Sequence, residues 1–384
     1  MTKAITILGA TGSVGASTLS IIRENRNSFE IVGLTSHSNA ELLAALAVEF
    51  APKYVVLSDV RHIAVLEQKL AATDIQILTG EEGLEFLAIQ KADLVVAAIT
   101  GFAGFKPVFA AINAGTDIAL ANKEALVAGG HLLMPLATQK GVTLLPIDSE
   151  HNAIFQCMMG QKWDHVEQVT LTASGGPFLS MTSQEMYHVP PSRALKHPTW
   201  SMGAKITIDS ATMMNKGFES LEAAWLFGLD KKQICAIIHP QSIMHGFVKF
   251  KDESVIAHLA PTDMKVPISH ALGWPERLKI TCEKLNLTQI SNLEFTEIKE
   301  DQFPSYNLAY QLIGDNPCYA IALNAANEIA VALYLNKQVS FGDIYKINAK
   351  TIDLIKLTEL PDYHSIIDYN NYARNIAHSI LPSL

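Results

Sequence analysis

Residues 1–149 alternate short apolar runs with stretches of helical periodicity, and this alternation constrains the fold more than any other feature of the chain. Strands buried on both faces read as continuous apolar runs, and helices between them are typical of crossovers in a parallel sheet. The pattern therefore predicts an α/β fold that begins with a doubly wound parallel sheet. Its predicted strands are residues 4–8, 30–35, 54–57, 93–99, 117–121 and 142–147, with helices such as 16–25 and 39–50 between them.

A glycine-rich segment, LGATGSVG at 8–15, lies between the first predicted strand and the first predicted helix. Gly9, Gly12 and Gly15 permit a tight turn, a close approach of the backbone to a pyrophosphate and close packing of helix on strand. The helix N-terminus adds N–H donors and the positive end of the helix dipole. The segment indicates a Rossmann-like dinucleotide site, and a glycine-rich turn without a ligand is the alternative.

The end of the second predicted strand indicates which dinucleotide binds. NAD sites usually carry an Asp or Glu there, which bonds the ribose hydroxyls. Here the chain reads His37-Ser38-Asn39, without an acid that would repel a 2′-phosphate, and this favours NADP. Because the position has no Arg or Lys either, hydroxyl groups, Asn39 and His37 would have to hold the phosphate.

Two carboxylates, Asp148 and Glu150, follow the last predicted strand of this region in IDSEHNAIFQ. In an extended segment, side chains two residues apart point the same way, so the pair would face one site at the carboxyl end of the sheet. Adjacent carboxylates repel each other unless a cation lies between them, and a hard divalent ion prefers oxygen ligands. The pair indicates a metal site, and solvated loop acids or a helix cap are the alternative.

A third carboxylate is expected from residues 209–225, where the chain reads DSATMMNKGFESLEAAW. We favour Glu219 because it opens an amphipathic helix close to Asn215 and Lys216. Lys216 could also form a charge-assisted hydrogen bond with a phosphate. The candidates for the third ligand are Asp209, Glu219 and Glu222.

Further stretches suit a bound anion or a lid. Ser174 in ASGG and Ser210 in IDSATMM offer hydroxyls, and HPTWSMG at 197–203 could form a lid with Trp200 at its tip. Taken singly, each stretch also fits ordinary turn chemistry. Three histidines do not have the spacing of a common zinc site, so zinc is set aside; they are His239, His245 and His258.

The rest of the chain suggests two further domains. Residues 150–285 mix strand-like runs with helices, as expected of an α/β domain with an antiparallel or mixed sheet, and 286–302 reads as a linker. Residues 303–384 are predicted to form a helical bundle. In 316–335 the apolar residues fall on one helix face, and Pro317 suits a first helical position. Two more helices are expected at 340–356 and 363–381.

Composition narrows the partners and the compartment. A net charge of −9 argues against a nucleic-acid or acidic-membrane binder. The four cysteines are scattered without a C-x-x-C pair, which suits a reducing compartment. We find no apolar run of about 18 residues, and a strand already begins at residue 4, so we expect no membrane span and no targeting peptide. A cytoplasmic protein is the expectation.

Several stretches, in this order, closely resemble the 1-deoxy-D-xylulose 5-phosphate reductoisomerase family. The match runs from the first strand to the C-terminal helices, and IDSEHNAIFQ together with SATMMNKG is highly specific. The stretches are ILGATGSVG, ANKEALV (121–127), IDSEHNAIFQ, ASGGPF (173–178), HPTWSMG, DSATMMNKG with Glu219, HPQSIMHG and NAANE (324–328).

The resemblance implies conversion of 1-deoxy-D-xylulose 5-phosphate to 2-C-methyl-D-erythritol 4-phosphate in the non-mevalonate isoprenoid pathway. The carbon skeleton is rearranged and the resulting aldehyde is then reduced by NADPH, with Mg²⁺, Mn²⁺ or Co²⁺ as the metal, in a homodimer. The implied metal ligands are Asp148, Glu150 and Glu219, which with Lys123 and His197 form the implied catalytic set.

The resemblance also implies the binding residues. NADPH would contact Thr11, Gly12, Ser13, Val14, Asn39, Asn122, Glu124 and Gly203, and the end of the second predicted strand adds His37 and Ser38 as candidates. The phosphosugar would contact Lys123, Ser149, Glu150, Ser174, His197, Trp200, Ser210, Asn215, Lys216 and Glu219. The chain departs from the family at one place, because the family commonly has Gly-Lys-Asn or Gly-Arg-Asn where this chain has His37-Ser38-Asn39.

Two other functions stay open on the sequence alone. A semialdehyde-type dehydrogenase also has a GATG-x-V-G loop, but it would need a catalytic cysteine, and Cys157 lies in IFQCMMG, which reads as a buried helix. A nucleotide sensor that signals through its helical domain is the second alternative, and it leaves the carboxylates and the phosphate loops without a purpose.

Overall fold

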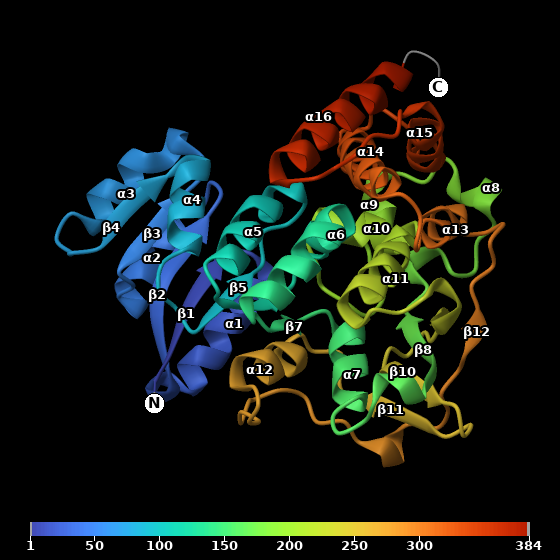
Figure 1. Cartoon of the computed structure of the whole chain (residues 1–384), viewed down its shortest axis with the longest axis horizontal. Helices are drawn as coiled ribbons and strands as arrows, with labels where there is room; N and C mark the ends of the chain where they lie inside the picture. Colours follow the sequence, from blue (N-terminus) through green and yellow to red (C-terminus); the bar gives the residue numbers. More distant parts are fainter. Residues whose placement is uncertain (1, 382–384) are drawn as a thin grey trace. The chain divides into compact units, whose positions relative to one another are not determined.

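The computed structural model describes residues 2–381, which form two compact units (Figure 1). The first unit consists of the chain up to Ala125, Leu133–Asn152 and Asp263–Glu283. The second consists of Leu126–Leu132, Ala153–Thr262 and the residues from Lys284 onward. The central sheet and the C-terminal helices thus pack as one unit.

The first unit contains a seven-stranded sheet in the order β4-β3-β2-β1-β5-β6-β7. Every neighbouring pair is parallel, and strand order reverses at β1, between β2 and β5, so the predicted doubly wound sheet is confirmed. The strands are β1 (Lys3–Leu8), β2 (Phe29–Ser36), β3 (Tyr54–Leu57), β4 (Gln76–Thr79), β5 (Leu94–Ala97), β6 (Asp117–Leu120) and β7 (Leu144–Pro146).

Helices connect these strands. They are α1 (Ser13–Glu24), α2 (Ala40–Phe50), α3 (Ile63–Leu70), α4 (Gly80–Ala88), α5 (Phe105–Asn113) and α6 (Lys123–Lys140), with 3₁₀ turns η1 (Arg26–Ser28), η2 (Val60–His62) and η3 (Phe102–Gly104). Helix α12 (Lys265–Gly273) joins them from far along the chain and contacts α1, β6 and β7. Lys3 Nζ donates to the Leu272 carbonyl at 3.1 Å, and Lys265 pairs with Glu24 at 3.3 Å. These contacts place residues 263–283 in the first unit, although the sequence analysis assigned them to the central domain.

The second unit contains a five-stranded sheet in the order β11-β10-β8-β9-β12. Strands β8 and β9 are parallel and the other neighbours are antiparallel, which confirms the mixed sheet. Strand β12 lies inside the predicted linker 286–302, where it pairs with β9. The strands are β8 (Val166–Ala173), β9 (Ile234–Ile238), β10 (Met244–Phe250), β11 (Val255–Leu259) and β12 (Thr296–Glu297).

Helix α7 (Ser149–Cys157) carries the chain from the first unit into the second. The other helices of the second unit are α8 (Ser183–Met186), α9 (Pro191–Ala194), α10 (Ala204–Ala211), α11 (Met214–Phe227), α13 (Pro304–Gln311), α14 (Pro317–Leu335), α15 (Phe341–Leu354) and α16 (Tyr363–Ile380). The 3₁₀ turns are η4 (Trp163–His165), η5 (Gly176–Phe178), η6 (Lys231–Gln233) and η7 (Leu287–Gln289).

Helix α14 is the core of the C-terminal helices. Pro317 occupies its first turn, and the Asn316 side chain caps it by accepting from Cys318 N at 3.0 Å. With 19 residues and a mean hydropathy of 1.4, α14 is long and apolar enough to cross a membrane, which the sequence analysis did not anticipate. However, 72% of the 18-residue apolar stretch within α14 is buried. The helix contacts α10, α15 and α16, as expected of a core helix.

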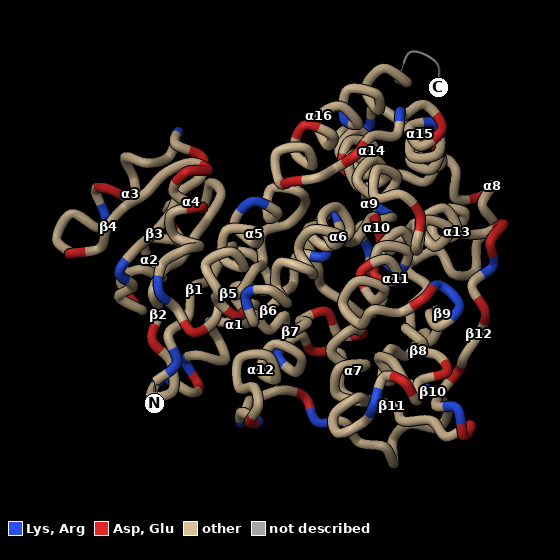
Figure 2. The backbone as a smooth tube through the Cα atoms, viewed as in Figure 1, with Lys and Arg blue, Asp and Glu red and all other residues tan. Residues whose placement is uncertain are grey.

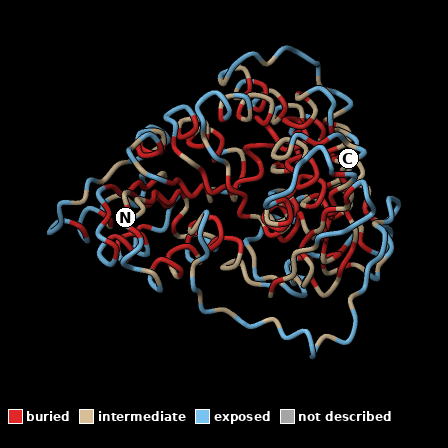
Figure 3. The backbone as a smooth tube through the Cα atoms, turned by 60° about the horizontal axis from the view of Figure 1, so that its bottom comes forward, coloured by how far each residue is buried: buried red, intermediate tan, exposed pale blue. Residues whose placement is uncertain are grey.

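Burial and charge follow this division. Buried segments run through the interior of each unit, and exposed segments surround them (Figure 3). Basic and acidic residues are interspersed along the chain in both units (Figure 2). The candidates for function are therefore polar side chains at the ends of the buried strands and helices.

Candidate active site

The glycine turn after β1 is closely packed. Gly9 has a φ of +91°, and a Cβ there would lie 2.6 Å from the Ala98 carbonyl oxygen. A Cβ at Gly15 would lie 2.4 Å from the Gly9 oxygen. Gly12 differs, because its nearest such contact is 3.4 Å. Gly9 and Gly15 are therefore required by the turn itself, whereas Gly12 leaves space in front of it.

The N-terminus of α1 meets that space. Gly12 is the N-cap, and no side chain of the described residues caps the helix. Gly12 and Ser13 are exposed, with Thr11 and Val14 half-buried. Backbone N–H groups and the positive dipole end thus face outward where a pyrophosphate would bind.

The end of β2 is tied to the glycine turn. Thr35 Oγ1 accepts from Gly9 N at 2.7 Å, and the hydroxyls of Thr11 and Ser36 lie 2.8 Å apart. The Asn39 side chain caps α2, accepting from Leu42 N at 3.1 Å. The three residues predicted at the 2′-phosphate follow β2 and are exposed; they are His37, Ser38 and Asn39.

Asn122 organises the neighbouring strand ends. It is 2% exposed and caps α6, where its Oδ1 accepts from Ala125 N at 3.1 Å. Its Nδ2 donates to the carbonyls of Ile99 at 2.6 Å and Gly101 at 2.9 Å and to Glu124 Oε2 at 3.2 Å. Asn122 and Glu124 therefore hold the loop after β5, and their contact with NADPH stays a prediction.

The two acids after β7 do not lie on an extended segment, so the extended conformation predicted for them is wrong. Helix α7 begins at Ser149, and Asn152 N donates to the Asp148 carbonyl at 2.9 Å, which makes Asp148 the N-cap. Glu150 lies in the first helical turn and accepts from Ser149 Oγ at 2.6 Å. Both carboxylates thus stand at a helix N-terminus, where negative charge is favoured.

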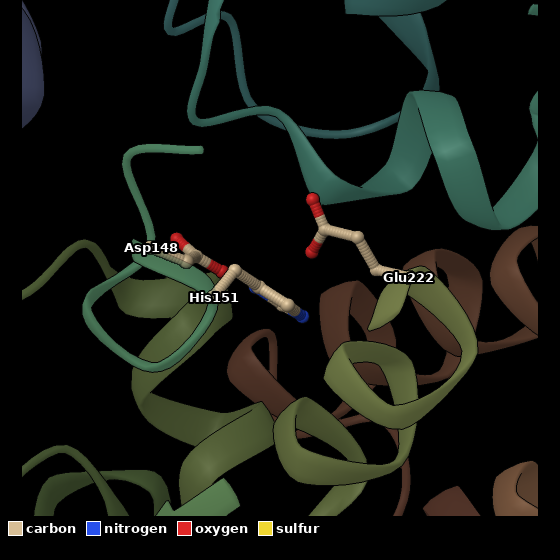
Figure 4. A group of neighbouring side chains, drawn as sticks. All are labelled: Asp148, His151 and Glu222. Carbon is tan, nitrogen blue, oxygen red and sulfur yellow. The ribbon is translucent and has the colours of Figure 1, made fainter. Parts of the chain in front are cut away.

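Asp148 pairs with Lys123 of α6. The Lys123 Nζ lies 2.7 Å from Asp148 Oδ2, and the two side chains are only 6% and 14% exposed. Figure 4 draws Asp148 and His151 at the start of α7, and Glu222 on α11 of the second unit. Within the first unit, the sequence thus brings together one lysine and a carboxylate that were both predicted to act in catalysis.

The start of α7 is fixed by Asn152 and His270. Asn152 Nδ2 donates to the Pro146 carbonyl at 2.8 Å and lies 3.1 Å from His270 Nδ1. Burial lowers the pKa of His270 to about 4, so its ring is neutral and can accept this bond. These contacts hold the turn that carries Asp148 and Glu150.

Helix α11 carries the acids and the lysine predicted in the second unit. Glu219 is 2% exposed and accepts from Asn215 Nδ2 at 2.5 Å, and it also pairs with the equally buried Lys216. Glu222 follows three residues later on the same side of the helix, and it is also 2% exposed. Buried Glu219 and Lys216 and half-buried Asn215 thus form one polar cluster on a single helix.

Two predicted phosphate-site serines meet at His197. Its Nε2 lies 3.0 Å from Ser174 Oγ and 3.1 Å from Ser210 Oγ. Its Nδ1 accepts from Trp200 N at 2.9 Å, so the proton must be on Nε2, which donates toward the serines. Burial lowers the pKa of His197 to about 4 and keeps the ring neutral. His197 therefore joins the predicted lid loop to the serine pair.

A buried polar chain behind Ser210 was not foreseen from the sequence. Asp209 is paired with Lys205 at 2.8 Å and accepts from Asn327 Nδ2 of α14 at 2.7 Å. Asn327 Oδ1 in turn accepts from Asn348 Nδ2 of α15 at 3.1 Å. Asn327 belongs to the NAANE stretch, and an amide inside an otherwise apolar helix is the sequence signal that points to this brace.

Comparison with known proteins decides the family. One family model, described as 1-deoxy-D-xylulose 5-phosphate reductoisomerase, matches residues 5–130, and two models described as C-terminal domains of that enzyme match residues 144–227 and 259–376. The chain belongs to the 1-deoxy-D-xylulose 5-phosphate reductoisomerase family. A family member from Chlorobium phaeovibrioides is 45% identical over 383 residues, which is 99% of this chain and 100% of that protein.

Solved structures of reductoisomerases agree over the whole chain. The Zymomonas mobilis enzyme, in complex with NADPH, superimposes with a TM-score of 0.93 at 39% identity and covers 100% of both chains. A second reductoisomerase, in complex with NADPH, fosmidomycin and magnesium, gives a TM-score of 0.94 at 41% identity, covering 99% of this chain and 98% of that one. The family resemblance and the fold class expected from the sequence are both confirmed.

The dehydrogenase alternative lacks a usable thiol at its candidate position. Cys157 is buried near the end of α7, and burial raises its pKa to about 11. A nucleophilic cysteine needs a lowered pKa, because the thiolate is the reactive species. Cys157 therefore fits the core of a reductoisomerase and does not fit a catalytic nucleophile.

We expect Gly15→Ala to destabilise the protein by about 1–3 kcal/mol, as overpacking does, because the new Cβ meets backbone atoms of the turn. NADPH affinity should fall as well. Gly12→Ala is the matched control for stability only, since its φ of −81° suits any residue and its Cβ has room within the protein, whereas that Cβ would enter the proposed pyrophosphate site. Urea unfolding and NADPH titration check both variants. An unchanged unfolding midpoint in Gly15→Ala would contradict the packing described for the turn.

We expect stability to decrease as the pH falls from about 6.5, the usual pKa of an unfolded histidine, toward 4. The pKa of folded His197 is about 4, so the unfolded chain binds more protons in this window and protonation favours unfolding. Above pH 6.5 the full stability is present. Urea unfolding between pH 4 and 7 should show a shallower slope for His197→Gln, with His270 supplying the remainder. Identical slopes would mean that His197 is not buried as a neutral ring.

Proposed function

We propose that this protein is an NADPH- and metal-dependent reductoisomerase that converts 1-deoxy-D-xylulose 5-phosphate to 2-C-methyl-D-erythritol 4-phosphate. The observation that carries the proposal is the match over 99% of the chain to a reductoisomerase solved with NADPH, fosmidomycin and magnesium. The reaction rearranges the ketose phosphate skeleton and then reduces the aldehyde that results.

The glycine turn and its neighbours suit NADPH, which supplies the hydride when bound. A close-packed turn with an uncapped helix N-terminus is a ready site for a pyrophosphate. We assign the pyrophosphate to Thr11, Gly12, Ser13 and Val14, and the rest of the cofactor to His37, Ser38, Asn39, Asn122, Glu124 and Gly203.

The three acids Asp148, Glu150 and Glu219 suit a hard divalent cation, because they offer carboxylate oxygens from buried or half-buried side chains. Mg²⁺, Mn²⁺ or Co²⁺ would act there as a Lewis acid that polarises the substrate carbonyl. Asp148 and Glu219 are each neutralised by a lysine of their own unit, Lys123 and Lys216. If these acids bound a cation, the ammonium groups of Lys123 and Lys216 would be placed to interact with the substrate.

The lysine and the serine cluster suit the two ends of the substrate. Lys123 stands beside Asp148 and can stabilise negative charge that develops at the reacting carbons. We assign the phosphate to Ser174, His197, Ser210, Asn215 and Lys216, with Ser149 as a further substrate contact. Binding of the substrate phosphate can supply the energy that holds the carbon fragments of the rearranging substrate in place. It can also close the loop that carries Trp200, and the closed loop excludes water.

We further propose that the enzyme is a cytoplasmic homodimer whose partners are its small substrates, without nucleic acid or membrane. The net charge of −9 and the buried apolar face of α14 support the absence of nucleic acid and membrane, and the dimer is proposed from the family resemblance. Sedimentation equilibrium should give twice the chain mass of 41.9 kDa. A monomeric mass under assay conditions would refute the dimer and leave the activity open.

The activity has a direct test. NADPH absorbance is followed after adding 1-deoxy-D-xylulose 5-phosphate, with Mg²⁺, Mn²⁺ or Co²⁺ or with EDTA. We expect oxidation that requires both the phosphosugar and the divalent ion, and a methylerythritol phosphate product by mass spectrometry. Oxidation that persists in EDTA, or none with any ion, would refute the proposed function.

A further inference from the structure

This chain lacks a permanent cation at the end of β2, where it reads His37-Ser38-Asn39. The 2′-phosphate of NADPH is an anion, and selective binding of it over a ribose hydroxyl normally uses an Arg or Lys. If the proposed function is right, the cation must come from another element. Strand β3 pairs with β2, and the segment that follows β3 contains such a cation, Arg61.

The segment after β3 continues in contact with the end of β2. Leu57 pairs with Ser36 in the parallel register, and Ser58 N donates to the Ser36 carbonyl at 3.0 Å. One residue further, Asp59 N donates to the His37 carbonyl at 2.7 Å. The backbone thus holds Asp59 directly against the first residue of the predicted 2′-phosphate site.

Asp59 orients the guanidinium of Arg61. Its Oδ1 accepts from Arg61 N at 3.1 Å and Nε at 2.9 Å, and its Oδ2 accepts from Nη2 at 2.6 Å. The Asp59 side chain is 8% exposed, whereas that of Arg61 is 80% exposed. One edge of the guanidinium is therefore held by Asp59, while most of the Arg61 side chain is exposed.

This arrangement is more than a local cap. Asp59 caps η2 through Arg61 N, and that bond needs nothing from the Arg61 side chain. The bonds from Nε and Nη2 additionally restrict a long side chain that would otherwise be mobile. Asp59 also raises the pKa of Arg61, chiefly by the side-chain hydrogen bond.

We propose that Arg61 binds the 2′-phosphate of NADPH and replaces the basic residue that the family carries at the end of β2. Arg61 is then the residue that sets the preference for NADPH over NADH. Asp59 is a positioning residue, because its backbone is bonded to His37 and its carboxylate holds one edge of the guanidinium. Arginine suits this role because its planar fork can bond a carboxylate and a phosphate at the same time.

The test measures equilibrium binding of NADPH and NADH by fluorescence titration. We expect Arg61→Gln to weaken NADPH binding about tenfold, in line with a charge-assisted bond at an exposed site, and to leave NADH binding unchanged. Arg23→Gln is the matched control, because Arg23 also forms an exposed two-bond pair, with Glu49, elsewhere in the same unit. The Arg23→Gln variant should retain the wild-type ratio of the NADPH affinity to the NADH affinity.

A second substitution tests whether a positive charge at a neighbouring position restores binding of the 2′-phosphate. Ser38→Arg in the Arg61→Gln background should restore NADPH preference, because it returns the cation to the position that the family uses. An Arg61→Gln variant with the wild-type ratio of the two affinities would overturn the assignment of Arg61 and leave the reductoisomerase proposal intact. A wild-type protein that binds neither dinucleotide would instead refute the proposed function.

Discussion

The Asp148→Asn variant should lose about a thousandfold or more in turnover, because a Lewis acid supplies several kcal/mol of transition-state stabilisation. Asparagine keeps an oxygen that can accept from Lys123 but removes the charge that a divalent ion requires. NADPH binding should be unchanged, since the glycine turn follows a different strand. Steady-state kinetics after removal of metal, followed by titration with Mg²⁺, gives the comparison.

Two controls separate this loss from a folding defect. Breaking a buried ion pair can cost about 3–5 kcal/mol, so urea unfolding must be measured in parallel. Asp93→Asn is the matched variant, because Asp93 precedes β5 at the opposite, amino-terminal edge of the sheet and accepts from Ala4 N at 2.7 Å. It should keep full turnover. Wild-type turnover in Asp148→Asn would refute the metal assignment.

The Lys216→Ala variant should raise KM for the phosphosugar about a hundredfold, because a hydrogen bond to a charged group contributes about 1.5–3 kcal/mol. Lys216 is 3% exposed and its ammonium lies in the cluster with Glu219 and Asn215. The affinity for NADPH should not change. Steady-state kinetics at saturating Mg²⁺ measures the KM for the phosphosugar and the KM for NADPH.

Lys249→Ala is the control for that experiment. Lys249 also pairs with a glutamate, Glu253, at 2.6 Å, but it lies on strand β10 with 35% exposure. Its removal should alter neither constant. If Lys216→Ala changed only the nucleotide affinity, the phosphate site would have been assigned to the wrong residues.

The sheet of the first unit could be predicted to the extent that its strands are buried. Six strands were recognised because their apolar runs are continuous, and β3 matches residues 54–57 without any shift. Strand β4 (Gln76–Thr79) was missed, because it lies at the sheet edge, partly exposed, and has no apolar run. The placement of α12 could not be predicted either, since it depends on contacts with residues some 240–270 positions away.

The candidate site divides in the same way. The glycine turn could be predicted because it is local, with strand, turn and helix in sequence. The geometry around Asp148 could not be predicted, because α7 already begins at Ser149. Glu150 is therefore helical, and the two acids are not part of one extended segment. The pairing of Asp148 with Lys123 and the proton position on His197 depend on tertiary contacts that leave no periodic signal.

We propose that Asp148, Glu150 and Glu219 bind one divalent ion, and a crystal soaked in Mn²⁺ tests this assignment. We expect one anomalous peak with a carboxylate oxygen from each of the three residues at about 2.1–2.2 Å, a distance typical of a small hard cation. The peak should disappear in Asp148→Asn crystals grown in the same way. A peak that lacks any of these carboxylates, or no peak in an enzyme that still turns over, would contradict the account.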